Sequence, residues 1–176
     1  PEFNECNNDD LNSRMVISPS IDYIEENFNP SKFDKLSSEP VLEICFKNNN
    51  ENPSLDIQVQ YAPYKAHGGW ENIKDDYVNS IIKIISKYAN NIENCIDSKI
   101  LITPDDIEKN YHVSGGHWHH GEIQIDQLFM LRPIPGAAQY KTHLDGLYMC
   151  GAGTHPGGGM HGISGKNAAK VVLGDL

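Results

Sequence analysis

The sequence predicts an α+β fold, that is, a mixed α/β architecture, on three observations. An apolar run at 41–46 follows Pro40, and residues 55–61 alternate strictly between apolar and polar side chains, which is the period of a half-buried strand. Turn-forming residues at 47–53 separate the two runs, so we expect two antiparallel strands joined by a loop. Apolar residues recur at spacings of three and four over 70–90, which predicts a helix with one buried stripe.

Shorter elements complete the first two thirds of the chain. Residues 4–20 are polar and irregular, so we expect a frayed start or a loop there. A short helix is expected over 21–27 and a third strand over 99–103. Thr103 precedes Pro104, a pair typical of the N-cap and first position of a helix, so a further short helix should begin there.

The last third of the chain predicts a strand, a glycine loop and a helix, at 147–150, 151–159 and 159–173. Seven of the 15 glycines lie between Gly151 and Gly165, which is more than a turn requires. Such a loop lets a ligand approach the backbone, and the start of a helix offers free N–H groups and a positive dipole end to an anionic group. The alternative is a loop that only allows tight packing and binds nothing.

Two common nucleotide-binding motifs are absent from this segment. No Gly-Lys-Ser or Gly-Lys-Thr follows, which excludes a P-loop, and the glycine spacing differs from GxGxxG. No Ser-His-Asp or Cys-His arrangement can be recognised either, so the catalytic residues stay unknown.

Charge and glycine are distributed unevenly along the chain. Residues 1–110 contain 20 of the 24 acidic and 10 of the 14 basic residues, which accounts for the net charge of −10, while 111–176 contain 13 glycines and seven of the eight histidines. An acidic chain without clustered Lys and Arg does not favour nucleic acid. No apolar run approaches the roughly 20 residues of a membrane helix.

The start of the chain and the cysteines bear on its origin. The chain begins Pro1-Glu2-Phe3 without Met, so we expect a piece of a longer protein with a disordered or tag-derived start at 1–16. No CxxC motif occurs, and Cys45 and Cys150 lie in apolar runs where a thiol is usually buried. These features predict an intracellular protein with reduced thiols.

Residues 146–159 resemble the C-terminal flavin-binding signature of the phytoene-desaturase-like flavoproteins. The resemblance extends over about 17–173, and the other segments that support it are 59–64, 68–70, 101–106, 120–122, 126–129 and 132–133. It implies the C-terminal part of an FAD-dependent amine-oxidase-like fold. Residues 17–130 would be the end of a substrate domain with its sheet and helices, and 131–176 the return to the FAD-binding domain.

The resemblance also implies which residues meet the cofactor. Gly151, Ala152 and Gly153 would lie near the pyrophosphate and the ribityl chain, and the loop backbone at Gly158 would approach the ligand. The start of the last helix would lie near the flavin ring, through Gly159, Met160 and Gly162.

The implied activity is flavin-mediated hydride removal from a C–C or C–N bond, or its reverse, on an unknown small molecule. The N-terminal nucleotide-binding half of such proteins, with its GxGxxG unit, is missing here. We therefore expect this fragment to be inactive, with weak or absent FAD binding. The resemblance favours a mitochondrial location in a eukaryote and a cytoplasmic one otherwise.

Three histidines and one acid, His117, His119, His120 and Glu122, invite a metal-binding interpretation. Neither HExxH nor CxxC supports it, so we expect no native metal site, although a His-rich metal-binding segment stays an alternative function. His120 is instead a candidate for contact with flavin or substrate, or has a structural role. His155 would either shape the glycine loop or contact a ligand.

Arg132 is the single basic residue of an otherwise apolar stretch. It would form an ion pair with Glu122 or Asp126, or contact a substrate acid or the cofactor. A different class of function also stays open, a non-catalytic binding or regulatory module. Apolar faces such as that of 147–150, uncovered without the missing half, would then drive homo-oligomers or binding of a protein partner.

Overall fold

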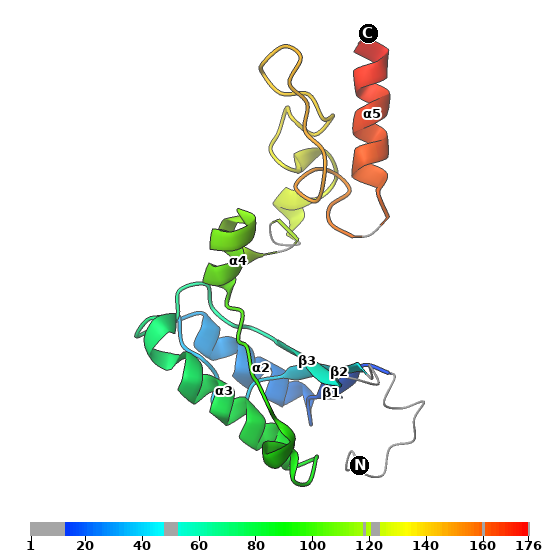
Figure 1. Ribbon diagram of the computed structural model, residues 1–176. Coiled ribbons are helices and arrows are strands. Elements are labelled where there is room, and N and C mark those ends of the chain that lie inside the picture. The colour runs from blue at the N-terminus through cyan, green and yellow to red at the C-terminus, as the bar shows by residue number, and fades with distance from the viewer. Residues whose placement is uncertain (1–12, 48–52, 118, 121–123, 160, 176) are drawn as a thin grey trace. The chain divides into compact units, whose positions relative to one another are not determined.

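The computed structural model describes residues 13–47, 53–117, 119–120, 124–159 and 161–175. The chain forms two compact units, Pro1–Asp105 and Asp106–Leu176. The first unit contains a small sheet and two helices (Figure 1): β1 (Met15–Ile17), α2 (Ile21–Ser31), β2 (Leu42–Lys47), β3 (Ser54–Val59) and α3 (Trp70–Ser86). Strands and helices therefore occur together, as the α+β prediction requires.

The sheet is antiparallel, in the order β1-β2-β3. Its register places Ile44 of β2 opposite Met15 of β1 on one side and Ile57 of β3 on the other. Because side chains alternate across a strand, this register aligns the apolar residues of all three strands on one face. The alternation of 55–61 thus predicted both the strand and its buried side.

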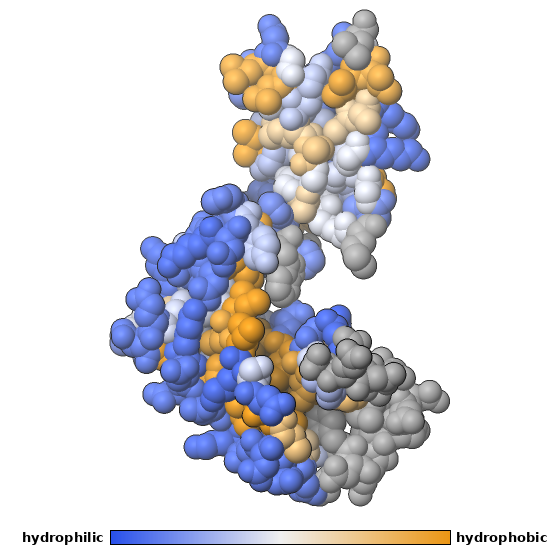
Figure 2. Space-filling view, viewed as in Figure 1, coloured by the Kyte–Doolittle hydropathy of each residue, from blue (hydrophilic) through white to orange (hydrophobic). Residues whose placement is uncertain are grey.

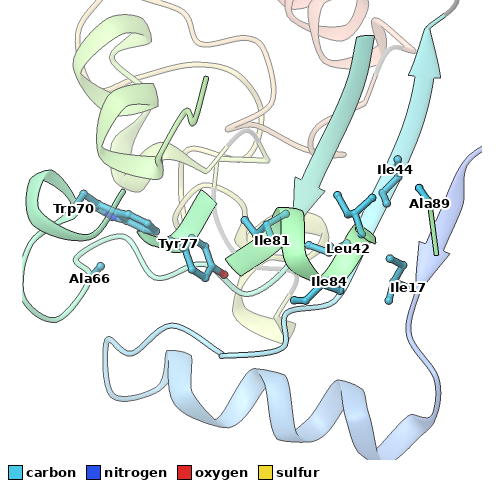
Figure 3. Packing of buried hydrophobic residues seen from close by; sticks show 10 residues of the cluster. Ile17, Leu42, Ile44, Ala66, Trp70, Tyr77, Ile81, Ile84 and Ala89 are labelled. Atoms are coloured by element: carbon cyan, nitrogen blue, oxygen red, sulfur yellow. The ribbon is translucent and has the colours of Figure 1, made fainter. Parts of the chain in front are cut away.

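The core of the first unit lies between that face and α3 (Figure 3). Leu42 and Ile44 of β2 are fully buried, and the helix contributes Ile81, Ile84 and Ile85 to the same cluster. Two predictions are confirmed here, the antiparallel strand pair and the stripe of α3.

Two helix boundaries differ from the predicted ones. Helix α2 reaches Ser31 instead of 27, because Phe28 lies one turn after Ile24 and continues its apolar face. Ser20 caps this helix, accepting a hydrogen bond from the backbone N–H of Tyr23 at 3.1 Å. Helix α3 ends at Ser86, a turn earlier than predicted.

The predictions for two other segments are wrong. Residues 15–17, expected in an irregular start, form β1, because their Met-Val-Ile sequence can pair with the edge of β2. Residues 99–103 form no strand: Ile100 and Ile102 are 87% and 61% exposed while Thr103 is buried. The alternation is real, but the segment has no neighbouring strand to pair with in the described sheet.

The second unit consists mostly of loops and short turns. Helix α4 (Pro104–Tyr111) begins at the predicted proline, at the boundary between the units, and is followed by single 3₁₀ turns at Ser114–Gly116, Ile125–Gln127 and Phe129–Leu131. The last element is α5 (Ile163–Asp175), drawn red in Figure 1.

The predicted buried strand at 147–150 is not formed. Only an isolated bridge joins Lys141 to Tyr148, while Leu147 is 51% exposed and Cys150 is exposed. The four residues between Gly146 and Gly151 form one side of a tight turn and are too few for a ladder. The prediction that Cys150 is buried is therefore also wrong, and Cys45 is half-buried.

Helix α5 starts four residues later than predicted. Gly159 and Gly162 have φ angles of +140° and +63°, which are not helical, so the helix begins only after Gly162. Among the described residues, no helix is both long and apolar enough to cross a membrane. The assignment of 17–130 to a substrate domain and 131–176 to an FAD domain stays a prediction.

Replacing Ile44 by alanine tests the core. Because its side chain is fully buried between the sheet and α3, we expect Ile44→Ala to lower the free energy of unfolding by about 2–5 kcal/mol. Urea unfolding followed by far-UV circular dichroism measures this. The matched control is Ile100→Ala, whose side chain is 87% exposed and should change stability by less than about 0.5 kcal/mol. Equal losses in both variants would show that the core lies elsewhere.

Candidate functional site: the glycine loop

Residues 151–159 form two successive turns, closed by a buried threonine. The N–H of Thr154 donates to the carbonyl of Gly151 at 3.1 Å, and its hydroxyl donates to the same oxygen at 2.9 Å. The N–H of Gly157 then donates to the carbonyl of Thr154 at 2.7 Å. Because Thr154 is only 2% exposed, the loop is held from inside by its own hydrogen bonds.

Glycine is required in this loop for two separate reasons. Gly151 and Gly157 have φ angles of +95° and +107°, a region that other residues rarely adopt. At Gly158 the reason is space, since a Cβ would lie 3.2 Å from Nδ1 of His119 and 3.4 Å from Cβ of Ala152. Gly153 is different again: no heavy atom lies within 4 Å of where its Cβ would be.

Several backbone amides of the loop have no protein partner. Within the described part of the chain, no acceptor receives the N–H groups of Ala152, Gly153, Gly158 and Gly159. Unpaired amides on a turn are donors for an anion or a polar ligand. The loop therefore offers hydrogen-bond donors without a helix start.

A buried guanidinium lies under the loop. Arg132 is 4% exposed, and its Nη2 donates to the carbonyls of His119 and Ala152, each at 2.7 Å. It packs against Gly157, whose Cβ would lie 3.7 Å from the guanidinium carbon.

The hydrogen bonds of Arg132 differ from the predicted ion pair. Asp126 does not pair with it, Glu122 lies outside the described residues, and no described carboxylate lies within 4 Å of the guanidinium. Its Nε is buried and has no hydrogen-bond partner. The site thus combines unpaired amides with a buried positive charge that no described acid neutralises.

A tyrosine joins the loop to α5. The hydroxyl of Tyr140 donates to the carbonyl of His155 at 2.7 Å and accepts from the side-chain amide of Asn167 at 3.0 Å. The hydroxyl of Ser164 donates to the same carbonyl at 3.3 Å. The small residues Ser164 and Ala168 are buried, so the helix can approach closely. Sequence reasoning identified the small residues but missed Tyr140, whose surroundings in the sequence give no signal.

The start of α5 is less open than predicted. The N–H of Ile163 donates to Nδ1 of His161 at 3.1 Å, so a side chain of the chain itself takes the first donor of the helix. A Cβ on Gly159 would lie 2.9 Å from the ring of the same histidine. Met160, a predicted cofactor contact, lies outside the described residues.

The histidines lie near the loop without forming a metal centre. His117 and His119 have ring centroids 5.6 Å apart, and the ring of His155 lies 6.3 Å from that of Phe129. His120 is exposed, and its carbonyl rather than its ring lies 3.4 Å from Arg132 Nη2. In the ranges that the structure describes, no three His, Cys, Asp or Glu side chains are arranged to hold a metal ion.

The far end of α5 is attached by charged groups. Asp175 accepts from Lys141 at 2.6 Å and from the hydroxyl of Tyr148 at 2.7 Å. Hydrogen bonds from Lys141 and then from Tyr148 lower the pKa of Asp175.

The chain is similar in sequence to a class of oxidoreductases. No model of a known protein family matches it. One limonene dehydrogenase polypeptide of Castellaniella defragrans is 33% identical over 124 residues, which cover 69% of this chain and 22% of that protein. The neurosporene-forming phytoene desaturase of Cereibacter sphaeroides is 26% identical over 104 residues, which cover 59% of this chain and 19% of that protein.

A higher identity is found with pyridine nucleotide-disulfide oxidoreductase domain-containing protein 2 of Mus musculus. It is 34% identical over 164 residues, which cover 87% of this chain and 28% of that protein. The chain is thus homologous to a part of the phytoene-desaturase-like oxidoreductases, which confirms the resemblance seen in 146–159. It spans less than a third of the length of each relative.

The link between loop and helix can be tested at Tyr140. Removing its hydroxyl in Tyr140→Phe leaves the buried carbonyl of His155 and the amide of Asn167 short of a partner, so we expect α5 to lose about 1–2 kcal/mol of stability. Amide hydrogen exchange over 163–175 should accelerate about tenfold. Tyr148→Phe, which removes an exposed hydroxyl from the same unit, should change exchange near Ser164 much less. Similar acceleration there in both variants would contradict the assigned role of Tyr140.

Proposed function

We propose that this chain is the C-terminal part of an FAD-dependent oxidoreductase and that its glycine loop contacts the cofactor. The observation that carries the proposal is the set of four unpaired amides in 151–159 above the buried Arg132. A flavin dinucleotide carries two phosphates, and amide donors together with a fixed positive charge fit such an anion. Homology to oxidoreductases supports the same assignment.

The residues fit the cofactor in two groups. Gly151, Ala152 and Gly153 would face the pyrophosphate and the ribityl chain, since the first and third have open space where a side chain would lie. The flavin ring would be approached by Gly158, Gly159, Met160 and Gly162. Arg132 would act from behind the loop because it is buried, whereas His120 is exposed and could meet flavin or substrate directly.

The bound flavin would supply hydride removal from a C–C or C–N bond, or its reverse. Two relatives are named as a dehydrogenase and a desaturase, which supports removal of hydrogen from the substrate. The chain's own contribution is to bind and orient: its amides hold the anion, and Tyr140 fixes the loop against α5. The location stays a prediction, mitochondrial in a eukaryote and cytoplasmic otherwise.

The isolated chain should bind FAD weakly or not at all and should be inactive. It spans 28% of the mouse relative, and we propose that the nucleotide-binding half with its GxGxxG unit belongs to the remaining length. One loop offers donors to only part of a dinucleotide, so the rest of the binding free energy must come from that half.

Flavin content tests the loop in the longer protein that carries this chain. A valine at Gly158 would press on His119 and Ala152 and displace the loop, so we expect Gly158→Val to lose most of its flavin while the fold of the first unit persists. The ratio of flavin absorbance to protein absorbance measures the loss. The control is Gly174→Val near the end of α5, where no atom lies within 4 Å of the added Cβ.

Two results would overturn this assignment. Unchanged flavin content in Gly158→Val would show that the loop is not the site. Stoichiometric, tightly held flavin in the wild-type 176-residue chain would show that the proposed missing half is not needed.

A second candidate function, association with a protein partner or a second copy, is favoured by the exposed apolar residues of the second unit. Phe129, Met130 and Leu173 are each more than 70% exposed, and hydrophobic surface on this unit is visible in Figure 2. Contiguous exposed apolar surface commonly marks a contact site.

Light scattering on the isolated chain tests this second function. We expect the apparent mass to rise with concentration, and the double variant Phe129→Ser, Met130→Ser to remain closer to a monomer. A monomer at every concentration in the wild-type chain would argue against self-association.

A further inference from the structure

The direction in which the Gly153 amide points is set by Arg132. The guanidinium lies on the inner side of the loop and receives the carbonyl of Ala152 at 2.7 Å. The peptide that follows this carbonyl is trans, so its N–H points opposite to its C=O. The N–H of Gly153 therefore points away from Arg132, and it donates to no described acceptor.

The same guanidinium fixes a second segment. Its Nη2 also donates to the carbonyl of His119, and Gly157 leaves room for its flat face. One buried group thus ties the histidine segment to the glycine loop. The ring of His119 lies close under Gly158, so Arg132 also sets the depth at which Gly158 rests.

The charge of Arg132 reinforces this geometry. A buried cation without a carboxylate normally costs free energy, and here backbone carbonyls replace the carboxylate among the described residues. Each carbonyl turns the negative end of its peptide dipole toward the guanidinium. The positive end, with the N–H, is consequently presented on the other side of the peptide.

We propose that Arg132 is the positioning residue of the anion site: from behind the loop it orients the Gly153 N–H toward the cofactor's diphosphate and raises the positive potential there. The inference rests on the proposed function for the identity of the anion. It does not rest on it for the orientation of the amide, which is a property of the chain without ligand.

Two variants and a control separate orientation from charge. Arg132→Met removes the charge and both hydrogen bonds at similar length, whereas Arg132→Lys keeps the charge and can donate to a carbonyl. Lys141→Met is the control, because it removes a cation of the same unit that contacts Asp175 and not the loop. All are made in the longer protein that carries this chain.

Two measurements are made on each variant. The first is the ¹⁵N–¹H signal of Gly153 in flavin-free protein labelled with ¹⁵N-glycine. The second is the FAD dissociation constant of the apoprotein, with the ³¹P spectrum of the bound diphosphate. We expect Arg132→Met to shift the Gly153 signal, move the ³¹P signals and weaken FAD binding about tenfold or more, an effect of the size of one charge-assisted contact. Arg132→Lys should recover part of the affinity, and Lys141→Met should match the wild type.

The outcomes distinguish this inference from the proposed function. If the wild type binds no FAD, the proposed function fails, and a shifted Gly153 signal in Arg132→Met still supports the positioning role. If the wild type binds FAD but Arg132→Met retains its affinity and ³¹P spectrum, the inference is overturned. It is also overturned if Arg132→Met loses FAD while the Gly153 signal is unchanged and Arg132→Lys recovers nothing, because the loss would then reflect general destabilisation.

Discussion

The second unit depends on one buried guanidinium that meets peptide carbonyls instead of a carboxylate. Few helices and no strand ladder stabilise the described part of this unit, so the loops need another source of order. Arg132 provides it by bringing two separate carbonyls, those of His119 and Ala152, to one nitrogen. The two segments are distant in sequence and share no secondary structure. A hydrogen-bonded cation here does what a sheet does in the first unit.

The first unit is organised by a different constraint, the row of apolar residues across three strands. The register that pairs Ile44 with Ile57 aligns this row, and α3 covers it with a matching stripe. Nothing in this unit resembles a reaction centre in the described residues. Its role in the proposed flavoprotein would be to provide a folded support, whereas the chemistry would belong to the glycine-rich segment.

Sequence patterns predicted what periodicity encodes and failed where partners decide. The stripe of α3 and the alternation of β3 are properties of single segments, so both were found. Residues 99–103 and 147–150 have strand-like composition, but a strand requires a neighbour, which composition does not reveal. The glycine loop was located correctly because its residue types have few uses. The partners of Arg132 and the role of Tyr140 were not predictable, since both act on backbone carbonyls distant in sequence.

The last helix is attached by unlike chemistry at its two ends. Its start is held by neutral hydrogen bonds from Ser164 and Asn167, whereas its end relies on the exposed Lys141–Asp175 pair. Salt screens the exposed pair and leaves the neutral bonds largely unaffected. Protonation of Asp175 acts in the same way: its lowered pKa means that the attachment is present at neutral pH and is lost as acid titrates the carboxylate. Ionic strength and acid should therefore fray this helix from its C-terminal end and leave the end that touches the glycine loop in place.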